Sequence, residues 1–333
     1  MRDLRIDFLK FVGLVMIILA HSGPPGGIFQ LRNFDVPLMV FCSGFVFSYG
    51  VSYSGYLSYV MARLQRLVIP VWFFLLFFFA FNSTLASDPD YVLLTFLFVE
   101  GEGLEYLWII QVFVSIAMVS PFIYKFNQLI RSDTMFFCLC FLLLVLYDLF
   151  ISWAGRELYQ DYKLLRTLLL LIPYSLVFLL GLRFKTKSNA SVLMTSVFCI
   201  VLFMVMFYWV GRTDDGILST QHFKYPPGLY YLSYAVAVTC FLLYCSTRFY
   251  AQLFAVPHLN NLILFVSSNS IWIYLWHIVF LGLIDGHWLV RWLLILSCSI
   301  LCMYLQVRIV KAIIAKASVR EKYAKLMLKT LTG

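Results

Sequence analysis

Charged residues are scarce in this sequence. Asp, Glu, Lys and Arg together make up 12% of its 333 residues, about half of the roughly 25% that is usual in soluble globular domains. Hydrophobic residues make up 62%, and the mean hydropathy is +0.90. The shortage of charge therefore excludes an ordinary soluble domain and predicts a chain that lies in a lipid bilayer. Aromatic residues, at 19% of the chain, fit the lipid-facing and interfacial surfaces of such a protein.

Cysteine motifs are also missing. None of the eight cysteines belongs to a CxxC pair or has a histidine at the spacing of a metal site, and all eight fall within apolar segments. We therefore expect no disulfide framework and no metal, and we expect the thiols to be small packing groups. The cysteines are Cys42, Cys138, Cys140, Cys199, Cys240, Cys245, Cys298 and Cys302.

The N-terminus lacks a good signal-peptide cleavage site. A basic start and a short apolar stretch resemble a signal peptide, but Asp3, Asp7 and Lys10 interrupt the stretch and HSGPP follows it. We therefore expect this segment to be retained as a helix.

Ten apolar runs are separated by polar or Gly/Pro-containing breaks. Most are close to the roughly 17–25 residues needed to cross a hydrocarbon core about 30 Å thick. We therefore expect an all-α polytopic membrane protein with about ten transmembrane helices. The runs cover residues 7–21, 35–50, 67–85, 104–124, 134–152, 165–182, 190–210, 228–246, 262–284 and 288–309.

The distribution of Lys and Arg predicts that both termini are cytoplasmic. With that orientation, 18 of the 25 Lys and Arg residues fall in inner segments and the other seven in outer segments. Topology thus accounts for the net charge of +9, and we expect no nucleic-acid partner. After a membrane domain at residues 1–310, the basic cytoplasmic tail at 311–333 is expected to lie against anionic lipid headgroups.

The first apolar run carries ionisable residues at both ends. In KFVGLVMIILAH, Lys10 and His21 are eleven residues apart, so they lie on nearly the same face of a helix, about 16 Å apart along its axis. The run is short for a span, and SGPPGG follows it; irregular backbone at membrane depth requires burial by protein or access of water. His21 therefore either lies at the bottom of a cavity open to the outer side, or simply caps the helix while Lys10 reaches the headgroups.

The same residues resemble the opening of the acyltransferase-3 family of integral-membrane O-acyltransferases. The mark of that family is a basic residue and, after ten intervening residues, a histidine. Lys10 and His21 match this pattern, and Arg5 and Asp7 match the Arg-x-Asp that precedes it. Lys10 stands where Arg is more usual.

Four further motifs extend the resemblance along the chain. They are VPLMVFCSGFVFSYG (with Ser43 and Gly44), RLQRLVIPVW (with Arg63, Arg66 and Pro70), LEYLWIIQVFVSIAMVSPFI, and IYLWHIVF (with His277). Pro37 stands where many members have Asp, which suggests the branch with a single membrane domain and no appended esterase-like domain.

The resemblance implies transfer of an acyl group, usually acetyl, from cytoplasmic acetyl-CoA to a hydroxyl of a cell-surface polysaccharide or its lipid-linked precursor. It also implies a multi-pass protein of the bacterial inner membrane, in contact with membrane lipids. Transfer to a sugar hydroxyl needs a base with a pKa near neutrality, which suits His21 as general base or as acyl carrier. The phosphates of coenzyme A need cationic partners, for which Arg5, Lys10, Arg63 and Arg66 on the inner side are candidates.

Three more residues have both a catalytic and a simpler interpretation. Asp35 begins the second apolar run on the outer side and either fixes the tautomer of His21 or caps its own helix. Ser43 is either a nucleophile or part of a small Ser-Gly pair at a helix contact. His277 lies in an apolar helix, where a core histidine is the default interpretation and the family motif makes it a candidate for the substrate site.

The remaining candidates for acceptor binding lie in outer segments. Glu105 and Tyr106 begin the fourth apolar run and either bind sugar hydroxyls or belong to an interfacial belt. The segment TQHFKYPPGLYY is either a lip that binds a saccharide or a simple loop ended by its two prolines. The candidates in that loop are His222, Lys224 and Tyr225.

Two other functions compete with acyl transfer. A transporter or flippase for a small polar solute or lipid-linked sugar would also need a polar cavity, but such proteins show repeats and paired broken helices, and only one broken helix is evident in the sequence. A glycosyl- or phosphotransferase would need carboxylates for metal-bound phosphates, and the inner segments hold few.

Overall fold

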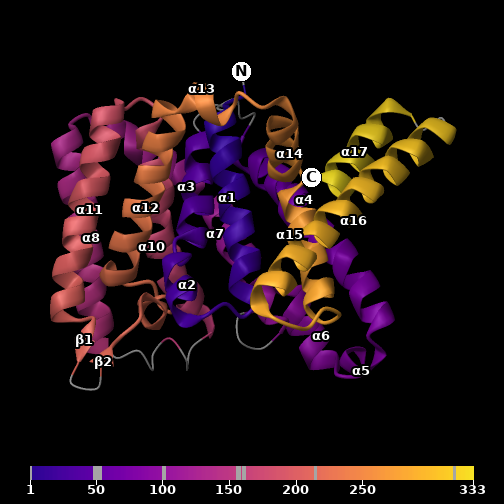
Figure 1. Cartoon of the computed structure of the whole chain (residues 1–333), viewed down its shortest axis with the longest axis horizontal. Helices are drawn as coiled ribbons and strands as arrows, with labels where there is room; N and C mark the ends of the chain where they lie inside the picture. The colour runs from indigo at the N-terminus through magenta and orange to yellow at the C-terminus, as the bar shows by residue number, and fades with distance from the viewer. Residues whose placement is uncertain are drawn as a thin grey trace. The chain divides into compact units, whose positions relative to one another are not determined.

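The computed structural model of the chain describes residues 2–47, 55–99, 103–154, 159, 163–213, 216–317 and 320–333. Regular structure in these ranges is almost entirely helical, as the apolar runs predict (Figure 1). A short antiparallel hairpin pairs β1 (Arg212–Thr213) with β2 (Gly216–Ile217). The chain divides into two compact units, which we describe separately.

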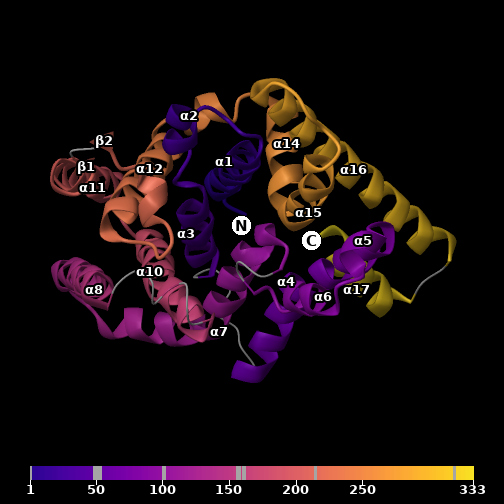
Figure 2. The same ribbon diagram turned by 90° about the horizontal axis from the view of Figure 1, so that it is seen from below.

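Unit 1 holds the described residues of 1–13, 26–52 and 115–256. In this unit α3 packs against α10 and α12, and α11 packs against α12 (Figure 2). Its elements are the first part of α1 (Leu4–His21), α2 (Gly26–Leu31), α3 (Asp35–Phe47), the last part of α7 (Trp108–Leu129), α8 (Asp133–Ala154), α10 (Lys163–Phe184), α11 (Asn189–Trp209), the hairpin, the 3-10 helix η2 (Thr220–Phe223), α12 (Leu229–Arg248) and α13 (Tyr250–Leu253).

Two glycines let α3 and α10 approach at backbone distance. A Cβ atom built on Gly44 would lie 2.0 Å from the carbonyl oxygen of Phe178, and one built on Gly181 would lie 2.1 Å from that of Phe41. Small residues at helix contacts are the usual means of close packing in membranes. The simpler interpretation of the Ser-Gly pair is therefore confirmed for Gly44.

Polar side chains tie the helix ends of unit 1 together. Arg183, at the end of α10, pairs with Asp133 at the start of α8, with 2.7 Å between Nη2 and Oδ1. The Oδ1 atom of Asp148 in α8 accepts a hydrogen bond of 3.1 Å from the backbone N–H of Leu229, the first residue of α12. These contacts provide hydrogen-bond partners for charged side chains and for a backbone N–H at a helix end, which lipid cannot provide.

Unit 2 holds the described residues of 14–25, 53–114 and 257–333. In this unit α15 packs against α16 and α4, and α17 packs against the same two helices. Its elements are the last part of α1, α4 (Tyr56–Phe81), α5 (Ser83–Ala86), α6 (Pro89–Phe96), the 3-10 helix η1 (Glu105–Leu107), the first part of α7, α14 (Pro257–Ser268), α15 (Ser270–Leu281), α16 (Trp288–Lys316) and α17 (Glu321–Thr332).

The predicted run 262–284 is broken into two helices. α14 and α15 meet at an angle of 82° on either side of Asn269, whose side-chain amide donates a hydrogen bond of 2.6 Å to the carbonyl of Phe265. The sequence predicts one broken helix, near the N-terminus, and the break at Asn269 corrects that prediction. The run contains no Pro or Gly at the break, and the polar stretch SSNS at 267–270 is the sequence feature that marks it.

The helix at the C-terminal end is held to α15 and α16 by side-chain donors. Trp272 Nε1 donates to the carbonyl of Thr330 at 2.9 Å, and Gln306 Nε2 donates to that of Leu331 at 2.6 Å. Gln306 also accepts a hydrogen bond of 2.7 Å from Trp276 Nε1. Residues predicted as a separate tail thus extend α16 to Lys316 and then form α17; the lipid contact of this segment stays a prediction.

Within the described ranges, seven helices are long and apolar enough to cross a membrane, or up to eight if the bent α14–α15 pair counts as one span. The protein is therefore a multi-pass membrane protein. All ten predicted runs are helical within the described residues, and the end of run 35–50 lies outside them. However, α1 contains three charged residues and α3 has only 13 residues, so neither counts among these spans. The count of ten and the cytoplasmic placement of both termini therefore stay predictions. α4 begins at Tyr56, earlier than the expected residue 67.

Candidate functional site

His21 is placed by the end of α1. The helix stops because Gly23 adopts a left-handed conformation (φ 73°) and two prolines follow it, an ending that lacks the amide donors needed to continue. Ser22 is buried, and its hydroxyl donates a hydrogen bond of 2.9 Å to the carbonyl of Ile18. The imidazole of His21 is half-buried at this fixed helix end.

A second histidine lies directly against His21. Nδ1 of His21 is 2.9 Å from Nε2 of His277 in α15. The two rings are stacked, with centroids 5.1 Å apart and planes 16° apart. His277 is fully buried, and its Nδ1 is hydrogen-bonded to the carbonyl oxygen of Tyr274 in the preceding turn. His277 is thus a buried histidine with hydrogen-bond partners, as the simpler interpretation expects. One of those partners, however, is His21, the other candidate histidine.

Two tyrosines complete this group. The ring of Tyr106, in η1, lies edge-on to His21 with centroids 4.8 Å apart. The hydroxyl of Tyr274 donates to the backbone carbonyl of Tyr106. We refer to His21, Tyr106, Tyr274 and His277 as the histidine–tyrosine cluster. All four belong to unit 2, and three of them were separate candidates in the sequence.

Tyr274 is the one member of the cluster that was not a candidate from the sequence. It lies three residues before His277 on the same helix, the spacing at which helical side chains meet. The spacing of Tyr274 and His277 within IYLWHIVF could have pointed to this contact. The chain has 21 tyrosines, however, so Tyr274 did not stand out.

The cations at the start of α1 have partners in unit 1. Arg5 pairs with Asp3 (2.6 Å between Nη2 and Oδ2), and its Nη1 donates a hydrogen bond of 3.1 Å to the hydroxyl of Thr247 in α12. Asp7 is paired with Arg2, at 2.6 Å. Lys10 is half-buried on the same helix.

The other two candidate cations lie on α4 in unit 2. Arg63 is half-buried, with its guanidinium 5.2 Å from the ring centroid of Tyr59. Arg66 lies one helical turn further on and is exposed. The binding of coenzyme A phosphates by Arg5, Lys10, Arg63 and Arg66 stays a prediction.

Asp35 is the centre of a buried charge group in unit 1. Its carboxylate accepts hydrogen bonds of 2.9 Å from Arg32 and 2.8 Å from the backbone N–H of Val36, and it lies 3.9 Å from Nζ of Lys224. Arg32, Asp35 and Lys224 are 3%, 1% and 4% exposed. The described partner of Nδ1 of His21 is His277, and that of the Asp35 carboxylate is Arg32. The orienting role of Asp35 stays a prediction.

The outer-segment candidates differ in accessibility. Lys224 was expected on a saccharide-gripping lip, but it is buried beside Asp35. His222 is exposed, with its ring 5.3 Å from that of Phe223. Tyr225 is half-buried and precedes a cis peptide bond to Pro226. Glu105 is exposed at the start of η1.

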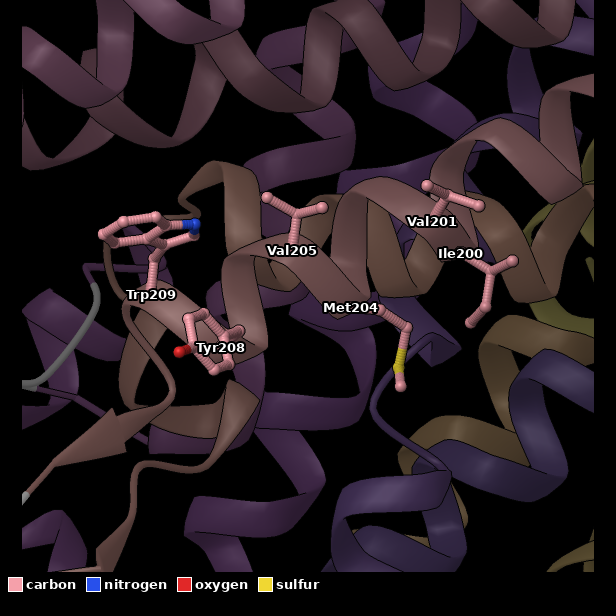
Figure 3. A pocket seen from close by; sticks show the side chains of 6 residues that line it. All are labelled: Ile200, Val201, Met204, Val205, Tyr208 and Trp209. Carbon is pink, nitrogen blue, oxygen red and sulfur yellow. The ribbon is translucent and has the colours of Figure 1, made fainter.

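An apolar groove of about 370 Å³ lies along α11 in unit 1 (Figure 3). Aliphatic and aromatic side chains line it, and α11 buries a smaller share of its surface than the other spans. Such a surface is typical of a lipid-facing helix and not of a catalytic site. The lining residues are Ile200, Val201, Met204, Val205, Tyr208 and Trp209.

No group of three or more His, Cys, Asp or Glu side chains within the described ranges could hold a metal ion.

A family model described as an acyltransferase domain matches residues 3–307 of the 333. The matched region includes the whole histidine–tyrosine cluster. The chain matches no curated protein and no solved structure.

Proposed function

Because the chain belongs to the acyltransferase-3 family and is therefore a membrane acyltransferase, we propose that it transfers an acetyl group from cytoplasmic acetyl-CoA to a hydroxyl of a cell-surface polysaccharide or its lipid-linked precursor. The protein would act in the bacterial inner membrane. The single observation that carries this proposal is the placement of His21 against His277, 2.9 Å apart, within the region that matches the family.

The chemistry requires a base at the acceptor hydroxyl. In the proposed step, His21 removes the hydroxyl proton while the oxygen attacks the thioester carbonyl of acetyl-CoA. The new C–O bond forms, the C–S bond breaks, and the proton passes to the departing thiolate of coenzyme A. No further reactant is needed, because the thioester supplies the driving force.

The two substrates would be held by different side chains. Arg5, Lys10, Arg63 and Arg66 are the proposed partners of the coenzyme A phosphates, since guanidinium and ammonium groups bind phosphate through charge-assisted hydrogen bonds. The exposed side chains of Glu105 and His222 and the half-buried rings of Tyr106 and Tyr225 are proposed to contact sugar hydroxyls. His277 is occupied by His21 and Tyr274, which argues against a direct contact with the acceptor.

A transporter or flippase is the second candidate, and one observation favours it. The break between α14 and α15 adds a second interrupted helix to the irregular backbone after α1, and paired broken helices are typical of transporters. The family match favours the enzyme.

The test is turnover of radiolabelled acetyl-CoA by purified protein in detergent, with and without crude surface glycan. We expect release of free coenzyme A and transfer of label to the glycan by the wild type, and loss of both in His21→Ala. His258→Ala, at an exposed position in α14, is the matched control and should keep wild-type activity.

Two results would contradict the proposal. Unchanged turnover in His21→Ala would remove His21 from the mechanism. An absence of turnover with any thioester, together with solute uptake by proteoliposomes, would favour the transporter.

A further inference from the structure

We infer that His277 is a positioning residue that fixes the tautomer of His21, with the proton on Nδ1 and the lone pair on Nε2. The inference rests on the proposed function only where it predicts an effect on catalysis. The tautomer itself is a property of the resting protein and is measured independently.

The argument starts at the backbone carbonyl of Tyr274. A carbonyl oxygen accepts hydrogen bonds and cannot donate them, so the ring nitrogen that faces it must carry a hydrogen. That nitrogen is Nδ1 of His277. A neutral imidazole has one N–H and one lone pair, and Nε2 of His277 is therefore an acceptor.

The second step follows from the contact between the rings. At a separation of 2.9 Å, Nε2 of His277 and Nδ1 of His21 share one hydrogen. Since Nε2 of His277 is the acceptor, Nδ1 of His21 is the donor. Nε2 of His21 then carries the lone pair, and it is the only ring nitrogen of His21 that can accept a proton or attack a carbonyl.

The orientation of both rings is fixed by the same cluster. Tyr274 acts at two points: its carbonyl holds His277, and its hydroxyl donates to the backbone carbonyl of Tyr106. The ring of Tyr106 in turn lies edge-on to His21, at an interplanar angle of 69°. α15 and η1, which both contact His21, are therefore linked to each other, and rotation of the His21 ring would break its contact with His277.

The arrangement has the logic of a nucleophile–base–orienter triad with one difference. In a serine protease triad a carboxylate holds the histidine in its working tautomer, whereas here a neutral imidazole does so and is itself held by a carbonyl. Without a partner that fixes the proton, a histidine interconverts between its two tautomers. Removal of His277 therefore leaves the lone pair of His21 on Nδ1 for part of the time and removes a contact that holds its ring.

Three variants separate this role from a structural one. His277→Leu fills the space without an acceptor, and His277→Gln offers an amide oxygen near the position of Nε2. Tyr274→Phe removes the hydroxyl but keeps the carbonyl that faces Nδ1 of His277. Each is compared with the wild type after a check that it is purified folded, by its thermal unfolding profile.

The first readout is the ¹⁵N spectrum of protein labelled at histidine, with the His21 signals assigned by their loss in His21→Ala. We expect a protonated Nδ1 and an unprotonated Nε2 for His21 in the wild type and in Tyr274→Phe, and a mixture of tautomers in His277→Leu. A wild-type spectrum with the proton of His21 on Nε2, or an even mixture, overturns the inference whether or not the His277 and Tyr274 variants fold.

The second readout is steady-state kinetics with acetyl-CoA. Acid–base catalysis contributes about 10²–10⁴-fold to a rate, and we expect kcat of His277→Leu to fall by about 10²-fold while KM for acetyl-CoA changes less than about threefold. His277→Gln should recover part of kcat. Wild-type kcat in a folded His277→Leu overturns the inference even where His21→Ala is inactive; conversely, a fixed tautomer in a protein whose His21→Ala variant stays active supports the inference and removes the proposed function.

Discussion

Replacement of Gly44 by alanine is expected to force α3 and α10 apart. The new Cβ would lie 2.0 Å from the carbonyl oxygen of Phe178 and 2.9 Å from its carbonyl carbon. An ordinary carbon–oxygen contact is about 3.3–3.6 Å, so the helices must separate by more than about 1 Å at this point. Both atoms are backbone, and no side-chain rotation can relieve the contact.

The expected cost follows from two opposing terms. Overpacking of a well-packed interior costs roughly 1–3 kcal/mol, and a backbone–backbone clash of this size belongs at the upper end. Alanine is favoured over glycine in a helix interior by about 0.8–1.0 kcal/mol. We therefore expect a net loss of about 2 kcal/mol in the free energy of unfolding, for Gly44→Ala and equally for Gly181→Ala, whose Cβ would lie 2.1 Å from the carbonyl oxygen of Phe41.

The two substitutions act on one helix crossing, so they should not add. Once α3 and α10 have separated to admit the first methyl group, the second finds most of its space already open. The double variant should therefore be destabilised by clearly less than the sum of the single variants. Gly27→Ala is the matched control, because a Cβ at that helical position meets no atom within 4 Å.

The assay is thermal unfolding in detergent, followed by intrinsic tryptophan fluorescence. We expect Tm to fall by several degrees in either single variant and to stay at or slightly above the wild-type value in Gly27→Ala. A wild-type Tm in Gly44→Ala would refute the close crossing of α3 and α10. Strict additivity in the double variant would show that the two glycines act at independent contacts.

Three further predictions test other parts of the structure. Asp35→Asn leaves the buried Arg32 without its carboxylate, so it should cost about 3–5 kcal/mol and sharply lower the yield of folded protein, whereas Asp88→Asn at the exposed N-cap of α6 should cost about 1 kcal/mol or less. Trp272→Phe removes the donor to Thr330, so trypsin should cleave faster at Lys322, Lys325 and Lys329, while cleavage at unchanged rates would contradict the docking of α17. Arg66→Gln should raise KM for acetyl-CoA without lowering kcat if Arg66 binds a phosphate, and an unchanged KM would exclude that role.

The sequence predicted the positions of the helices more accurately than their ends. Apolar runs mark the part of each helix that fits the hydrocarbon core, and every run is helical within the described residues. α4, however, begins at Tyr56, because its first turns contain Ser58, Arg63 and Arg66, which are good enough helix residues but lower the hydropathy. The bend at Asn269 was missed because it contains no Pro or Gly, although the polar residues 267–270 interrupt the apolar run at this point.

The candidate site could be predicted residue by residue but not as a group. His21 and His277 are 256 positions apart in the sequence, and only the packing of unit 2 brings their rings into contact. The sequence also placed Lys224 on an outer surface, because loop lysines are usually solvated. Its burial depends on Asp35, 189 positions away, and one carboxylate in a distant helix is not visible from the loop's own composition.

The tautomer of His21 also bears on the choice between direct transfer and an acyl carrier. Acylation of Nε2 would oblige the ring to give up the proton on Nδ1, and the acceptor that faces Nδ1 is Nε2 of His277. His277 cannot pass a proton onward, because its own N–H faces the carbonyl of Tyr274. The carrier route would therefore place a positive charge on a ring that is 0% exposed, which is costly without a paired anion. Direct transfer places the charge on the half-buried ring of His21, where it lasts only until the thiolate takes the proton. The inferred tautomer therefore favours the proposed direct transfer, with His21 as general base, over a role for His21 as acyl carrier.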